Sequence, residues 1–169
     1  EGAFFDSKER SLTFICKSSQ FETIPGHPFV YTASQKLLED FQKKKLGEIS
    51  RPRQGLATGD NGKFTRIWFE ISTTNFCLNS HNRDEAQKSN KKWFPYNKGG
   101  EYRKWFGNND WVVDWSKDGF EIRNFRDEKG KLCSRPQNMD AYFQPSITWS
   151  KVSTSGIAFR FKDWGHIFD

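Results

Sequence analysis

The pattern of hydrophobic and polar residues changes along the chain, from mixed segments with one clear helix to alternating strands. The helical pattern begins at Gln35 and continues to about Lys44, with Ser34 placed to cap it. Leu37, Leu38 and Phe41 recur there at helical spacing. The basic residues that end this run suit the negative end of a helix dipole.

A turn-rich segment follows, because residues 51–62 hold three glycines and one proline. Glycines permit positive backbone φ angles, so this segment predicts a loop. The compact apolar run Phe64–Ile71 predicts a short helix or strand, and the polar stretch Thr73–Asn90 predicts an excursion over the surface.

The second half of the chain is patterned for strands. Trp111, Val113 and Trp115 alternate with other residues in the two-residue period of a strand. A turn is expected at Ser116–Gly119, and the strand pattern resumes at Phe120–Arg123 before a polar loop at Arg126–Asp140. Three further runs predict a closing meander, with Phe159 and Phe161 facing the same way: Ile147–Val152, Ile157–Phe161 and Gly165–Phe168. We therefore predict an α+β fold with a β-rich C-terminal half, as one domain over residues 1–169.

Composition explains how such a chain can build a core. Hydrophobic residues make up 34% of the 169 positions, but aromatic residues reach 17%. Each large ring buries roughly 150–250 Å², so a core can be built from few residues. We expect the following side chains in the core: Trp93, Trp105, Phe106, Trp111, Trp115 and Trp149.

Positive charge is concentrated in one part of the chain. Residues 35–104 hold fifteen Lys and Arg against eight Asp and Glu, although the whole chain carries a net charge of only +6. A basic half favours a polyanionic partner, of which nucleic acid is the commonest. A merely solvated basic surface is the alternative, and charge alone does not decide between them.

Motifs for catalysis or metal binding do not occur in the sequence. The cysteines Cys16, Cys77 and Cys133 are widely spaced, as are the three histidines, which indicates a reducing, cytoplasmic environment and no metal site. No nucleophile elbow, triphosphate loop, methyl-donor loop or Asn/Asp-Pro-Pro-Tyr/Phe motif occurs. No run of about 18 apolar residues predicts a membrane span. We therefore expect no catalytic residue and no cofactor in this chain.

Three segments, taken in order, resemble one family: Gln54–Asn61, Lys92–Asn108, and Ile147–Ser150 leading to Gly165–Asp169. They are similar to the C-terminal region of PglX-like adenine-specific DNA methyltransferases of bacterial BREX phage-defence systems. That family is related to type IIG restriction-modification enzymes with a TaqI-like specificity domain. The resemblance implies a larger parent protein, of which this chain is a fragment. By this resemblance, an upstream catalytic domain of the parent would bind S-adenosylmethionine, and this part would help to select the sequence of double-stranded DNA.

The candidate DNA contacts lie in the first two of these segments and beside them: Arg51, Arg53, Gln54, Thr58, Asn61, Lys63, Arg66, Lys98, Arg103 and Lys104. The amides of Gln54 and Asn61 suit an adenine edge, whereas Lys98 and Lys104 suit phosphates. A purely structural turn is the alternative for the first segment. The alternative for the whole chain is a protein-interaction domain that uses its aromatic surface. That domain would hold a partner in a defence complex without direct DNA contact. The partners expected for the chain are double-stranded DNA, the missing catalytic domain and other defence-system subunits.

Overall fold

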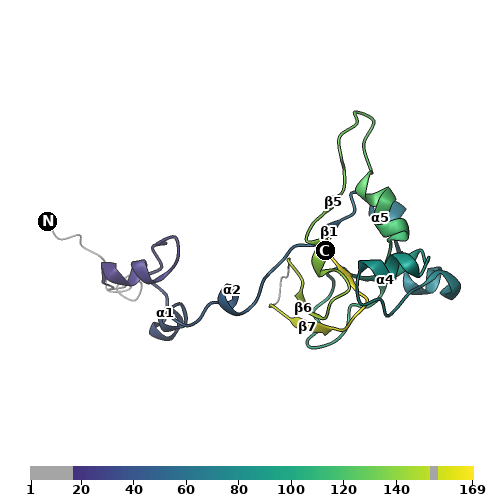
Figure 1. Ribbon diagram of the computed structural model, residues 1–169. Coiled ribbons are helices and arrows are strands. Elements are labelled where there is room, and N and C mark those ends of the chain that lie inside the picture. Colours follow the sequence, from purple (N-terminus) through teal and green to yellow (C-terminus); the bar gives the residue numbers. More distant parts are fainter. Residues whose placement is uncertain (1–16, 153–155) are drawn as a thin grey trace. The chain divides into compact units, whose positions relative to one another are not determined.

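The computed structural model describes residues 17–152 and 156–169 (Figure 1). The chain divides at Pro52 into two compact units, Glu1–Pro52 and Arg53–Asp169, where we expected one domain over residues 1–169. Cys16 lies outside the described residues. None of the helices in the described ranges is long and apolar enough to cross a membrane.

The described part of the first unit, residues 17–52, holds three short helices: η2 (Ser18–Thr23), α1 (Gln35–Asp40) and α2 (Leu46–Ile49). The predicted start and cap of α1 are confirmed, because the hydroxyl oxygen of Ser34 accepts a hydrogen bond from the Leu37 amide at 3.2 Å. The helix ends four residues earlier than predicted. Lys45 has extended backbone, with φ −79° and ψ 150°, and precedes α2, so the basic run links two helices.

The second unit is built on a four-stranded sheet in the order β2–β4–β3–β8. Its strands are β2 (Thr65–Ile67), β3 (Trp93–Asn97), β4 (Trp111–Asp114) and β8 (Ile167–Phe168). The strand predicted from alternation around Val113 is therefore confirmed as β4. Val113 pairs with Thr65 on one side and with Phe94 on the other, and all three side chains are buried.

The core lies where these strands meet α4 (Arg83–Lys88), α5 (Ser116–Arg123) and η5 (Met139–Ala141). Aromatic rings dominate it, as the composition predicts. Phe94 meets Phe143 edge to face with 5.6 Å between ring centroids, and Trp115 meets Tyr142 in the same way at 5.3 Å. Such pairs add about 0.5–1.5 kcal/mol beyond the area they bury.

Of the tryptophans expected in the core, only Trp115 is fully buried. Trp93 and Trp111 are half-buried, and the ring of Trp111 packs against the core cluster. Trp149 is exposed, so its predicted place in the core is wrong.

The predicted turn after β4 is confirmed, but the strand expected after it is wrong. Lys117, Asp118 and Gly119 have φ angles of 50°, 58° and 68°, which place all three in the left-handed region. A Cβ on Gly119 would lie 2.5 Å from the Trp115 ring, so this position needs glycine. The chain then forms a helical turn that carries Ile122 into the core.

The apolar run after the glycine-rich loop divides into α3 (Asn61–Phe64), β2 and η3 (Trp68–Glu70). The polar stretch before β3 is an excursion that carries η4 (Thr73–Asn75) and α4. Ala86 of α4 reaches the core.

The expected closing meander is confirmed only in part. β6 (Ser146–Trp149) and β7 (Phe159–Lys162) pair antiparallel, whereas β8 leaves them and joins β3 in parallel. A further small ladder joins β1 (Leu56–Ala57) to β5 (Arg135–Pro136). The predicted α+β class with a β-rich second half is confirmed.

Candidate nucleic-acid interface

The predicted glycine-rich loop is held tightly on two sides. The carbonyl oxygen of Gly55 accepts from the Gln137 amide at 3.1 Å, and that of Gln54 accepts from the Asn138 side chain at 2.8 Å. A Cβ on Gly55 would lie 1.9 Å from the carbonyl oxygen of Phe168, so glycine permits this close approach. The loop is therefore rigid where it presents the exposed side chain of Gln54.

The second predicted base-reading residue is already engaged. The buried hydroxyl of Thr58 donates to the side-chain oxygen of Asn61 at 2.9 Å. Asp60 caps α3 beside it by accepting from the Lys63 amide at 3.0 Å. A bidentate bond from Asn61 to adenine needs both its amide atoms, so DNA would have to compete with Thr58 for the oxygen.

Cations around this loop differ in how firmly they are held. Arg53 forms an ion pair with Asp140 at 2.5 Å. The Lys63 ammonium lies 5.0 Å from the ring centroid of Phe64 and 4.9 Å from that of Phe125, and its side chain is exposed. Lys63 can therefore reach a phosphate at little cost, whereas Arg53 would first lose its carboxylate partner.

Arg66 points back into its own segment. One terminal nitrogen donates to the carbonyl oxygens of Gly62 at 2.5 Å and Thr65 at 2.6 Å, and the guanidinium lies 5.8 Å from the Trp93 ring centroid. These contacts suit a structural role for Arg66. Arg51 is exposed and belongs to the other unit.

The remaining predicted contacts are held by other elements. Lys98 follows β3 and lies 4.2 Å from the ring centroid of Trp111. A guanidinium nitrogen of Arg103 lies 4.0 Å from a carboxylate oxygen of Glu101, and the neighbouring Lys104 is exposed. The ten predicted residues thus fall into separate groups. Only the group around the glycine-rich loop lies next to β1 and β5.

The segment that carries Arg103 and Lys104 is fastened to β7. Trp105 donates its amide to the Phe159 carbonyl at 2.8 Å and accepts from the Phe161 amide at 3.0 Å. Beneath it, the buried ammonium of Lys162 donates to the Gly107 carbonyl at 2.7 Å. Burial is the main reason why the pKa of Lys162 falls to about 8.

The predicted core positions of Trp105 and Phe106 are wrong. Their side chains are 73% and 74% exposed. Trp105 also has a φ of 69°, a left-handed conformation that costs a bulky residue about 1–3 kcal/mol. Two buried cations from β7, Arg160 and Lys162, occupy the space under this segment instead.

The β6–β7 pair also turns cations inward and apolar side chains outward. Its outward surface is made of four apolar side chains, Ile147, Trp149, Phe159 and Phe161, which we call the apolar face. Phe159 and Phe161 do face the same way, as predicted, but toward solvent. Soluble monomers rarely expose large contiguous apolar patches, so this surface indicates an interaction site.

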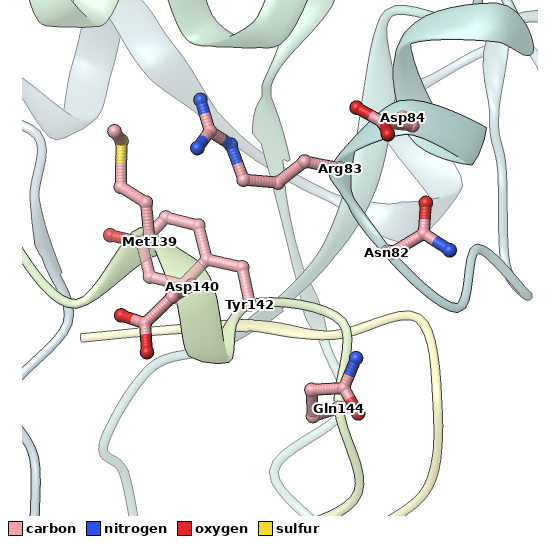
Figure 2. A pocket seen from close by; sticks show the side chains of 7 residues that line it. All are labelled: Asn82, Arg83, Asp84, Met139, Asp140, Tyr142 and Gln144. Atoms are coloured by element: carbon pink, nitrogen blue, oxygen red, sulfur yellow. The ribbon is translucent and has the colours of Figure 1, made fainter.

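A pocket of about 200 Å³ lies between α4 and η5 (Figure 2). Seven residues line it: Asn82, Arg83, Asp84, Met139, Asp140, Tyr142 and Gln144. The guanidinium of Arg83 is held by Asp118, with 2.9 Å between Nε and Oδ1, and Tyr142 is buried, which raises the pKa of its hydroxyl. The pocket is smaller than the 300–1,000 Å³ typical of cofactor sites. In residues 17–152 and 156–169, no three His, Cys, Asp or Glu side chains group as metal ligands.

Sequence reasoning missed the cations that follow α5, because it treated Arg126–Asp140 as one polar loop. Within that stretch, Lys131 and Arg135 are exposed, and Arg135 pairs with Ala57 of the glycine-rich loop. Gly130, between basic residues and close to Leu132, is the sequence signal that could have predicted a hairpin there.

Comparisons with known proteins extend this picture. No protein-family model matches the chain. It is similar, over most of its length, to adenine-specific methyltransferases. Adenine-specific methyltransferase PglX of Lacticaseibacillus casei (strain Zhang) is 37% identical over 164 residues, covering 94% of this chain and 13% of the relative. Adenine-specific methyltransferase BrxX of Escherichia coli O9:H4 (strain HS) is 40% identical over 153 residues, covering 89% and 11%. The resemblance inferred from the three motifs is confirmed, and the chain spans only about an eighth of these relatives.

Proposed function

We propose that this chain binds double-stranded DNA and contributes target recognition to an adenine-N6 DNA methyltransferase of a restriction-modification or phage-defence system. The observation that carries the proposal is the similarity of 89–94% of the chain to two adenine-specific methyltransferases. The basic loop on β1 offers cations and the exposed amide of Gln54 from a rigid support. A separate catalytic domain would bind S-adenosylmethionine and act in the cytoplasm.

Binding of the 169-residue chain to duplex DNA should weaken steeply with salt. If roughly 3–5 phosphates are neutralised, log K should fall against log salt with a slope of about −3 to −4.5. The measurement is fluorescence anisotropy of a labelled 20-base-pair duplex titrated at four salt concentrations. Several unrelated duplex sequences serve as controls, since phosphate contacts carry no sequence information. A flat slope, or no binding at low salt, would contradict the proposal.

The apolar face favours a second candidate function, docking onto another protein surface. The partner that requires no further protein is the rest of the parent methyltransferase, because the chain spans only 11–13% of the length of its relatives. Interface cores are rich in aromatic residues, and the apolar face supplies two Phe and one Trp.

The cross-strand pair Ile147 and Phe161 gives a direct test of docking. Replacing both with threonine keeps the strand preference but removes apolar area. We expect the double variant to leave duplex binding by the isolated chain unchanged, and to lower methylation by the full-length enzyme at least tenfold. Phe69→Thr, an exposed phenylalanine on η3, is the control and should have little effect. Wild-type methylation by the double variant would contradict docking.

A further inference from the structure

The segment between α5 and β5 forms a hairpin that extends beyond both elements (Figure 1). We call residues 125–134 the arm. Arg126 pairs with Leu132 in an antiparallel bridge, and the Cys133 amide donates to the Phe125 carbonyl at 2.9 Å. All residues from 126 to 133 are exposed, so core packing explains none of them.

The tip of the arm is ordered by its own hydrogen bonds. One carboxylate oxygen of Asp127 accepts from the amides of Lys129 and Lys131, each at 2.9 Å. Gly130 donates to the Asp127 carbonyl at 2.9 Å and has a φ of 77°. The carboxylate of Asp127 thus binds the backbone, whereas Glu128, the other acidic residue of the tip, is exposed. The ammonium groups of both lysines point to solvent without an ion pair in the described part of the chain.

Burial shows which side of the arm faces outward. Ser134 is buried and donates to the Ile122 carbonyl, so its strand neighbours Cys133 and Arg135 point the other way, and both are exposed. By the same two-residue alternation, Lys131 lies on this outward side. The outward side of one strand therefore carries two cations, Lys131 and Arg135.

Lys63 adds a third cation to the same side. Phe125 lies opposite Cys133 in the hairpin, and the Lys63 ammonium lies over its ring at 4.9 Å. The glycine-rich loop supports this arrangement, because a Cβ on Gly59 would lie 2.8 Å from the Cys133 carbonyl carbon. The loop and the base of the arm thus form one continuous surface.

We propose that the arm enters the major groove of duplex DNA, with Lys63, Lys131 and Arg135 bound to phosphates. The major groove, about 12 Å wide, admits a two-stranded ribbon. A pre-ordered ribbon loses little conformational freedom on binding, and three cations on one side, none with an ion pair among the described residues, match the backbone that borders a groove. This inference rests on the proposed function and names the surface that performs it.

The salt dependence of duplex binding tests the arm. Each lost phosphate contact should make the slope of log K against log salt shallower by about 0.9, so Lys131→Ala with Arg135→Ala should reduce it by about 1.8. Lys88→Ala with Lys151→Ala removes the same charge from exposed positions away from the arm and should leave the slope close to that of the unmodified chain. Circular dichroism checks that each variant is folded.

A shortened arm provides a second test that does not depend on charge at single positions. Replacing residues 127–131 with Asn-Gly closes the Arg126–Leu132 pair with a two-residue turn. We expect weaker duplex binding with an unchanged melting temperature. If the unmodified chain binds duplex DNA and all arm variants bind equally well, the arm is not the contact, although the proposed function stands. If the unmodified chain does not bind, both ideas fail.

Discussion

Replacing Gly165 with alanine is expected to lower the free energy of unfolding by about 3 kcal/mol or more. The position has a φ of 91°, and a Cβ there would lie 1.8 Å from the carbonyl oxygen of Leu78. The backbone cannot easily move away, because Gly165 donates to the Phe143 carbonyl at 3.1 Å. Left-handed backbone costs alanine about 1–2 kcal/mol, and overpacking adds about 1–3 kcal/mol.

Gly130→Ala is the matched control for this prediction. Its φ is 77°, but a Cβ would meet nothing within 4 Å, so only the backbone cost of about 1–2 kcal/mol remains. Urea unfolding followed by circular dichroism gives both values on one scale. Equal losses in the two variants would show that the Leu78 segment yields to the new methyl group.

The fold was most predictable where the signal is local. Ser34 caps α1 through its own side chain, and the alternation around Val113 predicted the strand β4, although residues on both of its faces are buried. The length of α1 and the helical turn after Gly119 were harder to predict from the sequence. The helical turn follows the close packing of Gly119 against the Trp115 ring, a contact that the residue pattern does not show.

The orientation of β7 could not be predicted because alternation alone does not say which side faces the core. Phe159 and Phe161 have the spacing of buried residues, yet Arg160 and Lys162 point inward at 2% and 3% exposure. Their acceptors include two carbonyl oxygens that are more than fifty residues away in the sequence, those of Arg103 and Gly107, and the residues around β7 give no sign of these partners.

The candidate site was likewise predictable where the signal is local and unpredictable where it depends on contacts in the folded chain. The glycine-rich loop was predicted from residue types that permit tight turns, and Gln54 is exposed on it. The sequence could not show that Thr58 engages Asn61, nor that the carboxylate of Asp127 orders a basic arm beside Gly59. Each of these depends on side-chain geometry that only the folded chain defines.

Lys162 makes the stability of the second unit depend on pH. Burial lowers its pKa to about 8, with a smaller contribution from Arg160, whereas an ordinary lysine titrates at 10.5. Between these values the unfolded chain binds more protons than the folded chain, so the free energy of unfolding rises as pH rises. From pH 8 to pH 9.5 the gain should be on the order of 1–2 kcal/mol.

Thermal and urea unfolding at pH 8, 8.5, 9 and 9.5 measures this gain. The range stops there because burial raises the pKa of Tyr96 and Tyr142, so ionisation of the unfolded tyrosines opposes the trend at higher pH. Lys162→Met should remove the rise, while Lys129→Met, the same change at an exposed position, should retain it. A pH-independent wild type would mean that the Gly107 and Asn108 carbonyls and the Asn109 side chain solvate the ammonium as well as water does. A rise confined to wild type and the Lys129 variant would instead show that the fold buries the Lys162 charge at a cost, beneath the segment that carries Arg103 and Lys104.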